Sequence, residues 1–291
     1  GSVTSSNALL TVRVPPFIIT QPAPATQTVV AGNNATITVV AGGDPTLTYQ
    51  WLLNGAPVAG ATAATLTLNA VQVSQLGNYT VVVSNPYGTV TSAIATLDVK
   101  SAPFVATQPQ SLTVIQGSLA AFSVTAGGDG PFTYQWRFGG TNIVGATAAS
   151  FGLASALTNN AGNYSVVITS PYGSVTSSNA LLTVRVPPFI ITQPLSQSVV
   201  AGITVTFTVV AGGDPALTYQ WRFNGAAITG ATGTTLTLHG VQATQAGDYS
   251  VVVTNPYGTA TSANATLTVK TAPFVASHPQ SLTVLKGTNA A

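Results

Sequence analysis

The sequence predicts an all-β protein built from tandem β-sandwich repeats arranged as an extended rod. The tripeptide Tyr-Gln-Trp occurs three times, with its tryptophans at positions 51, 136 and 221, a constant spacing of 85 residues. The motifs Gly-x-Tyr and Pro-Tyr-Gly keep the same period. Between them lie short segments with the alternating pattern of strands, separated by Gly, Pro and Asn turns, and no segment has a helical period. A period of this size corresponds to one small domain per repeat.

The first half of a repeat is represented by residues 17–53. Residues 17–22 and 28–32 are β-type runs interrupted by prolines, as expected for an edge strand. Residues 35–41 alternate small or polar with branched apolar side chains, which predicts a strand with one buried face. A Gly-Gly-Asp-Pro turn follows, and residues 47–53 place two leucines, a tyrosine and the tryptophan on one face of the next strand.

The second half of the repeat begins with Asn54-Gly55, a strong signal for a tight hairpin. A short strand is expected near Pro57, and another at residues 65–68. Residues 78–84 and 89–99 are predicted to form the last hairpin, across the turn Asn-Pro-Tyr-Gly. Seven to nine short strands at such spacing predict a β-sandwich.

The order of these motifs resembles the immunoglobulin fold, nearest to the intermediate-set and bacterial immunoglobulin-like repeats of large secreted proteins. The resemblance covers essentially the whole chain. In that family the tryptophan packs against a disulfide, but this chain has no cysteine and carries valine at all six corresponding positions. The resemblance therefore implies cores held by apolar packing, with structural residues Trp51, Trp136, Trp221, Val39, Val81, Val124, Val166, Val209 and Val251.

The tyrosines of the Gly-x-Tyr motif fall where the family has its tyrosine corner, in which the hydroxyl bonds to backbone. They are Tyr79, Tyr164 and Tyr249. The acidic residue that the family carries four positions earlier is replaced here by an amide, at Gln75, Asn160 and Gln245. We expect amide hydrogen bonds to take the place of the family's salt bridge.

The repeat divides the chain into three whole domains and two partial ones. Residues 1–22 are identical to residues 173–194, so the chain is expected to begin with the end of a preceding domain. The predicted segments are the last strand of a preceding domain at 1–14, immunoglobulin-like domains at 15–99, 100–184 and 185–269, and the first strands of a following domain at 270–291.

The linkers between these domains are of two alternating types. Residues 12–16 and 184–188 read Val-Arg-Val-Pro-Pro and are called here Arg-type linkers. Residues 99–103 and 269–273 read Val-Lys-Ser/Thr-Ala-Pro and are called Lys-type linkers. Short linkers that end in proline are semi-rigid, so each domain is expected to add about 40 Å to a rod.

The composition excludes several classes of partner. The chain has seven Lys or Arg and five Asp, with no Glu, which leaves too little positive charge for a nucleic-acid surface. No apolar run reaches the length of a membrane-spanning helix. Without cysteine, neither disulfides nor thiolate metal sites can form. A surface of hydroxyls and amides suits an extracellular or cell-surface location and opposes lateral self-association only weakly.

Catalytic, cofactor and metal sites are not expected. The two histidines, His239 and His278, occupy positions that are not equivalent in the repeat and that do not recur. Calcium takes six to eight oxygen ligands and normally several carboxylates. The sequence offers only a single recurring aspartate per linker, which is too few for a calcium site. Because the histidines do not recur either, the prediction is that the protein is not an enzyme and binds no cofactor.

The linkers carry the most specific prediction for side-chain contacts. The Gly-Gly-Asp loop is expected to face the incoming linker, which pairs Arg13 with Asp44, Lys100 with Asp129, and Arg185 with Asp214. The alternative is a solvated Asp-Pro turn without such a pair. Aromatic residues are expected at the same end and either pack into the domain junction or stay exposed for ligands. They are Phe17, Phe104, Phe189, Tyr87, Tyr172 and Tyr257.

These observations predict a structural protein: the shaft of an extracellular bacterial filament, stalk or large surface protein. Its partners would be neighbouring immunoglobulin-like domains of the same chain, with lateral self-association into a filament. One alternative is an adhesin that binds glycan or protein through exposed aromatic residues and edge strands. Another is a spacer between modules of a secreted hydrolase.

Overall fold

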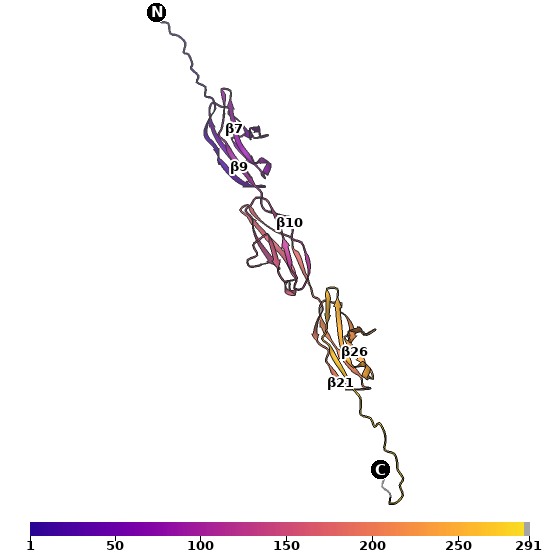
Figure 1. The fold of residues 1–291 in the computed structure, drawn as a ribbon. Coiled ribbons are helices and arrows are strands. Elements are labelled where there is room, and N and C mark those ends of the chain that lie inside the picture. Colours follow the sequence, from indigo (N-terminus) through magenta and orange to yellow (C-terminus); the bar gives the residue numbers. More distant parts are fainter. Residues whose placement is uncertain (288–291) are drawn as a thin grey trace. The chain divides into compact units, whose positions relative to one another are not determined.

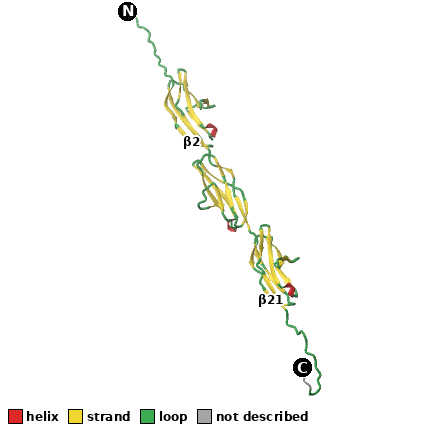
Figure 2. Ribbon diagram, viewed as in Figure 1, coloured by secondary structure: helices red, strands yellow, loops and turns green. Residues whose placement is uncertain are grey.

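The computed structural model describes residues 1–287, so the last four residues of the segment predicted at 270–291 lie outside the described part. Strands dominate the chain, and the described helices are three single 3₁₀ turns (Figure 2). The strands fall into three consecutive groups (Figure 1), called here the first, second and third repeats. The prediction of an all-β chain is confirmed.

The first repeat contains nine strands and one 3₁₀ turn, which together span residues 17–100. Their bounds are β1 Phe17–Ala23, β2 Thr26–Val30, β3 Ala35–Gly42, β4 Thr48–Leu53, β5 Ala56–Pro57, β6 Thr65–Leu68, η1 Val73–Gln75, β7 Gly77–Asn85, β8 Gly88–Thr91 and β9 Ala95–Lys100.

The second and third repeats have the same plan, except that one short break divides the strand equivalent to β3. The second repeat comprises β10 Phe104–Thr107, β11 Leu112–Ile115, β12 Ala120–Ser123, β13 Thr125–Gly127, β14 Thr133–Phe138, β15 Thr141–Asn142, β16 Ser150–Leu153, η2 Thr158–Asn160, β17 Gly162–Ser170, β18 Gly173–Thr176 and β19 Ala180–Arg185. The third repeat comprises β20 Phe189–Thr192, β21 Gln197–Val200, β22 Val205–Thr208, β23 Val210–Gly212, β24 Thr218–Phe223, β25 Ala226–Ala227, β26 Thr235–Leu238, η3 Ala243–Gln245, β27 Gly247–Asn255, β28 Gly258–Thr261 and β29 Ala265–Lys270.

Two sheets make up the sandwich of the first repeat. The small sheet has the strand order β1-β3-β6, and the large sheet has the order β2-β9-β7-β4-β5, with β8 also paired to β7. Most pairings are antiparallel, but β2 runs parallel to β9, with partners from Thr26 and Thr96 to Val30 and Lys100. The third repeat repeats this large sheet as β21-β29-β27-β24-β25. The parallel pair therefore joins the first and last strands of the large sheet.

Each core is centred on the predicted tryptophan and valines. Trp51, Trp136 and Trp221 are completely buried. The strands that carry them, β4, β14 and β24, pair with the central strands β7, β17 and β27 of the large sheets. The six valines that stand where the resembling family has half-cystines are all among the buried residues, namely Val39, Val81, Val124, Val166, Val209 and Val251. Branched aliphatic side chains fill the space where that family has its disulfide.

The last hairpin differs from the prediction of one continuous strand over residues 89–99. The structure has two strands there, β8 and β9, separated by residues 92–94. The buried Ser92 accepts a hydrogen bond on its Oγ from the Val81 N–H at 3.0 Å and donates one to the Ala93 carbonyl at 2.8 Å. A serine at this position satisfies buried backbone groups where the ladder is interrupted.

Residues 1–16 and 271–287 contain no strand. A strand needs a neighbouring strand to pair its backbone groups, and these two segments have none among the described residues. Their assignment to adjoining domains, like the domain boundaries at 15–99, 100–184 and 185–269, stays a prediction.

Candidate functional site: where the linkers meet the repeats

The Arg-type linkers bind the repeat that follows them through backbone hydrogen bonds. A residue before proline is held in extended conformation, which presents the carbonyls of Val14 and Val186 to the following loop. The Asp44 N–H donates to the Val14 carbonyl at 3.0 Å, and the Asp214 N–H donates to the Val186 carbonyl at 2.9 Å. The Gly-Gly-Asp loop therefore contacts the incoming linker in both repeats.

An asparagine from the turn between the last hairpin strands completes this contact. The Nδ2 of Asn85 donates to the Val14 carbonyl at 2.9 Å and to the Asp44 carbonyl at 3.2 Å. Its Oδ1 accepts from the Tyr87 N–H, which fixes the turn. Asn255 makes the same three bonds in the third repeat. One amide thus holds the linker, the Asp loop and the hairpin turn together.

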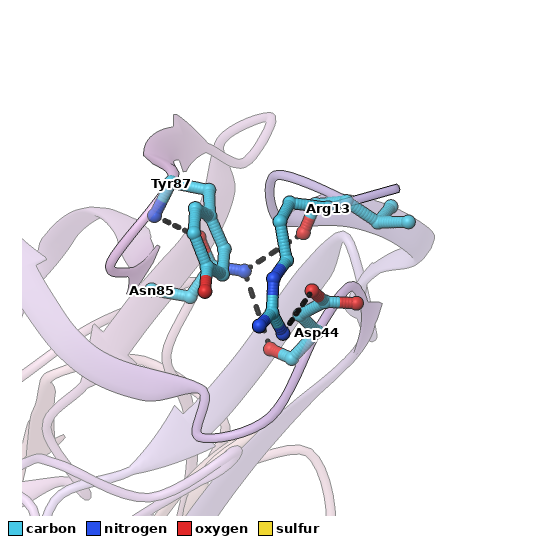
Figure 3. Close-up of polar contacts among 5 residues, drawn as sticks. Arg13, Asp44, Asn85 and Tyr87 are labelled. Atoms are coloured by element: carbon cyan, nitrogen blue, oxygen red, sulfur yellow. Dashed lines mark hydrogen bonds and ion pairs between the residues drawn. The ribbon is translucent and has the colours of Figure 1, made fainter. Parts of the chain in front are cut away.

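The arginine of the linker lies between a carboxylate and an aromatic ring (Figure 3). Arg13 Nη1 is 3.6 Å from Asp44 Oδ2, and the Arg13 guanidinium carbon is 5.4 Å from the centre of the Tyr87 ring. Arg185 has the same distances, 3.6 Å to Asp214 and 5.4 Å to Tyr257. Because the arginine side chains are 56% and 42% exposed, each ion pair contributes at most about 1 kcal/mol, and each cation–π contact a similar amount.

The Lys-type linker before the second repeat is different: Lys100 forms its close ion pair with Asp98, and Asp129 acts on it only as a nearby charge. Lys100 Nζ lies 3.2 Å from Asp98, two residues earlier on the same face of β9. The hydrogen bond to this carboxylate raises the pKa of Lys100 above its ordinary value. Asp98 is thus the main partner of Lys100, and the charge of Asp129 adds a smaller contribution in the same direction.

Asp129 binds the linker backbone instead. Its carboxylate accepts a hydrogen bond from the Ser101 N–H at 2.7 Å, and its own N–H donates to the Ser101 carbonyl at 3.1 Å. The position of Asn85 is taken here by Ser170, whose Oγ accepts from the Tyr172 N–H at 3.2 Å. A serine can fix the turn in this way but is too short to bridge to the linker as the asparagine does.

The predicted junction phenylalanines lie on the small sheet of their own repeat. Phe17 pairs with Gly42 across β1 and β3, and its ring covers that glycine, so a Cβ added there would sit 2.5 Å from the ring. The same pairing joins Phe104 to Gly127 and Phe189 to Gly212. The rings remain about half exposed, at 49%, 54% and 50%. Their packing into a domain junction stays a prediction.

The second glycine of the Gly-Gly-Asp loop lets the linker backbone lie directly against the loop. Gly43 has a φ of +137°, and a Cβ added to it would lie 2.9 Å from the Pro15 carbonyl oxygen. Gly213 has the same relation to Pro187. The loop can approach the linker this closely because the residue has no side chain.

The tyrosine corner is present in the first and third repeats. The Tyr79 hydroxyl donates to the Gln75 carbonyl at 2.8 Å, and the Tyr249 hydroxyl donates to the Gln245 carbonyl at 2.8 Å. Burial raises the pKa of Tyr79, Tyr164 and Tyr249 above the ordinary value. The amide that replaces the family's acid accepts from a backbone N–H, as Gln75 does from Gln72 at 2.9 Å.

The described residues show no arrangement suited to metal binding. Among residues 1–287, no three His, Cys, Asp or Glu side chains come together as a metal site would require. His239 is exposed near Thr204, with 3.4 Å between Nδ1 and Oγ1. In the same part of the chain, no helix has the length and apolar character needed to cross a bilayer.

Two contacts in the structure were not predicted from the sequence, although the residues that make them differ visibly between the repeats. Asn85 and Asn255 recur in the Asn-Pro-Tyr-Gly turn, whereas Ser170 stands in the second repeat. Asp98 precedes Lys100 by two residues, whereas Thr183 precedes Arg185. The asparagine and serine turns alternate along the three repeats, whereas Asp98 is particular to the linker at 99–103, since Thr268 precedes Lys270 in the other Lys-type linker.

Comparison with known proteins identifies the fold. Residues 15–85 and 187–255 match the immunoglobulin domain family. A three-domain I-band fragment of titin, I67–I69, superposes with a TM-score of 0.69 at 20% identity, over 88% of this chain and 99% of that fragment. The likeness establishes tandem immunoglobulin-like β-sandwiches.

Curated relatives are much longer than this chain. Endoglucanase C of Cellulomonas fimi is 38% identical over 108 residues, which is 35% of this chain and 10% of that protein. Hemicentin-1 of Mus musculus is 27% identical over 97% of this chain, which spans 5% of hemicentin-1. Human Roundabout homolog 1 is 28% identical over 61% of this chain, which spans 11% of it.

Proposed function

Because the chain consists of tandem immunoglobulin-like domains, we propose that it is a load-bearing shaft segment of an extracellular bacterial filament, stalk or large surface protein. The observation that carries this proposal is the parallel pairing of the first and last strands of each large sheet. Partners run from Thr26 and Thr96 to Val30 and Lys100 in the first repeat. The pairs β11·β19 and β21·β29 have the same parallel geometry.

Parallel terminal strands resist a pull along the chain. Tension draws β2 toward its start and β9 toward its end, and in a parallel pair these directions are opposite along the same axis. All hydrogen bonds of the ladder are then loaded together in shear, whereas an antiparallel hairpin pulled at its open end separates one bond at a time. The linker contacts add to this support, because each linker is bonded to the Asp loop of the repeat that follows it.

The amino-acid composition and one bacterial relative support the proposed location outside a bacterial cell. Cores that contain no cysteine do not depend on the redox state of the compartment. A surface rich in hydroxyls and amides, with twelve charged residues in 291, is compatible with close packing in a filament. The relative named endoglucanase C comes from a bacterium, Cellulomonas fimi.

Pulling single molecules of the 291-residue chain from its two ends tests the shaft proposal. Three unfolding events are expected, each releasing about 30 nm of chain. The variant Ala31→Pro removes the N–H that donates to the Lys100 carbonyl at 2.8 Å, so it is expected to weaken one event of the three. The equivalent bond from Gln116 to Arg185, at 2.7 Å, stays intact as the internal control. Extension without discrete force peaks would contradict the proposal.

A second candidate is a spacer within a secreted hydrolase. The observation in its favour is the 38% identity to 108 residues of an endoglucanase. Sequencing the complete gene tests it, because a spacer requires a catalytic module in the same chain. Under the shaft proposal, further immunoglobulin-like repeats are expected on both sides.

A binding role for the linker aromatics is a weaker alternative. Tyr87 is 42% exposed, but the Arg13 guanidinium covers one face of its ring. Tyr257 is covered by Arg185 in the same way. A glycan or protein that stacked on these rings would first have to displace the arginine.

A further inference from the structure

The outer face of the small sheet carries an apolar patch in the first and third repeats. In the first repeat, Phe17, Ile19 and Val40 are 49%, 60% and 45% exposed. Phe17 and Ile19 both approach Gly42, since a Cβ added there would lie 2.5 Å from the first and 3.1 Å from the second. Val40 lies two residues before Gly42 on β3, on the same outward face. These three side chains are called here the apolar patch.

The same patch recurs in the third repeat and is reduced in the second. Phe189, Ile191 and Val210 are 50%, 60% and 45% exposed, and they occupy the equivalent strand positions. In the second repeat the corresponding residues are Phe104, Ala106 and Thr125, which leaves the phenylalanine as the sole large apolar side chain of the three.

The strands around the patch have no charge. Every residue of β1, β3 and β6 is apolar, hydroxyl-bearing, amide or glycine, and the same holds for β20, β22, β23 and β26. Beyond the patch, threonines of neighbouring strands face one another, as Thr38 and Thr65 do at 3.2 Å between hydroxyls. Natural sheets usually prevent association by placing charged residues, especially lysine, on exposed strands. Here that protection is missing.

We propose that the apolar patches of the first and third repeats are a self-association surface, and that their partner is a second copy of this chain. The absence of charge disfavours an anionic membrane or nucleic acid, which would require cations on this face. A second copy presents the same neutral surface, so an isologous contact is self-complementary in polarity. A second copy also carries both patches, so each patch of one chain has a counterpart on the other.

This inference concerns lateral assembly and is independent of the strength of each repeat under load. Its failure would leave the pulling experiment, and with it the shaft proposal, unaffected.

Sedimentation equilibrium of the 291-residue chain over a range of concentrations tests the proposal. The wild-type chain is expected to associate. The variant carrying Ile19→Ala and Val40→Thr has the residues of the second repeat in the first patch. It is expected to weaken association about tenfold, because two large apolar side chains are lost from the contact. Its exposed side chains lie outside the core, so an unchanged melting curve will verify that the repeat remains folded.

Two further variants show whether association depends on the patches: one changes an exposed apolar residue elsewhere, and the other adds a patch to the second repeat. Val144→Thr changes an apolar side chain that is 99% exposed in the second repeat and is expected to leave association unchanged. The double variant Ala106→Ile with Thr125→Val builds a third patch and is expected to strengthen association. A wild-type chain that stays monomeric would overturn the proposal, whether or not the patch binds another protein. Equal weakening by the Val144 control would also overturn it.

Discussion

The Arg-type and Lys-type linkers perform the same attachment with different sets of side chains. In all three described cases the N–H of the loop aspartate donates to a linker carbonyl, at 2.9 to 3.1 Å. The carboxylate differs: Asp44 and Asp214 pair with the linker arginine, whereas Asp129 accepts from the Ser101 N–H. The backbone contact is therefore the constant feature, and the ion pair is an addition found on alternate linkers.

This difference shows how one cation can be redirected by its own strand. Lysine and arginine occupy the same place at the end of β9 and β19. Asp98 sits two residues before Lys100 on the same face and attracts it, whereas the uncharged Thr183 stands before Arg185. The second repeat also has Ser170 where the first and third have asparagine, so it lacks the amide bridge to the linker. We expect the Lys-type linker to be held less firmly than the Arg-type linker.

The largest effect is expected where the repeats do not differ. Trp221→Ala removes a completely buried side chain and the Nε1 hydrogen bond to the Gly233 carbonyl at 3.0 Å. The expected loss is about 3 to 5 kcal/mol, comparable to the stability of a small domain. Calorimetry should show one transition lost or shifted strongly, with the other two unchanged. Trp51→Ala and Trp136→Ala should behave alike, and a repeat that tolerates the change would show that the cores are not equivalent.

The tyrosine corner predicts a shared loss of stability at high pH. Burial raises the pKa of Tyr249 in the folded state above its unfolded value near 10, because ionisation would place a charge at a buried site. The resulting stability is complete below pH 10 and is lost as the pH rises through the folded-state pKa. Unfolding at increasing pH should show this decline.

Tyr249→Phe separates the corner from general alkaline effects. The change removes the hydrogen bond to the Gln245 carbonyl at 2.8 Å, with an expected cost of about 1 to 2 kcal/mol at neutral pH. The third repeat should then show a smaller decline in stability above pH 10 than the unmodified repeats. A decline of unchanged size would mean that other groups control the alkaline transition.

The sequence was sufficient to predict the fold class and the core residues, for a definite physical reason. A buried face in a strand requires apolar side chains at every second position, and this local rule indicated the strands that form the core. The family resemblance then singled out Val39, Trp51 and Val81, which are all buried. The tyrosine corner depended on the family resemblance, but its position was set by the same strand pattern. The extended arrangement of the repeats and the domain boundaries remain predictions.

The linker contacts were harder to predict because they depend on segments far apart in sequence. The Arg13 and Arg185 pairs follow from placing a loop and a linker at the same end of a sandwich. The amide bridge of Asn85 requires the hairpin turn to come within hydrogen-bond distance of the same linker, and no local pattern indicates that distance. The contact of each phenylalanine with a glycine of the neighbouring strand was not predicted, because it depends on strand register.

The asparagine bridge is the next strongest expected difference between the linkers. Asn255→Ser gives the third repeat the turn residue of the second and removes the donors to the Val186 and Asp214 carbonyls. The expected cost is about 1 to 2 kcal/mol for opening the linker contact, because two carbonyls each lose the hydrogen bond from the Asn255 Nδ2. Hydrogen exchange of the Asp214 N–H should become faster. In the opposite direction, Ser170→Asn should slow exchange of the Asp129 N–H, and no response in either variant would remove asparagine from the contact.

The arginine is expected to make the smallest difference. Arg185→Lys keeps the charge near Asp214 but replaces a planar group, which lies over the Tyr257 ring at 5.4 Å, with a compact ammonium. The expected loss is a few tenths to about 1 kcal/mol, since the side chain is 42% exposed and salt screens the pair. Faster exchange of the Asp214 N–H at low salt, with less difference at high salt, would agree with this expectation. Arg222→Lys, on an exposed position of β24, is the matched control. The contrary outcome is that Arg185→Lys leaves the exchange rate of the Asp214 N–H unchanged at every salt concentration while Asn255→Ser raises it. In that case the difference in attachment between the two linker types comes from the asparagine amide and not from the arginine.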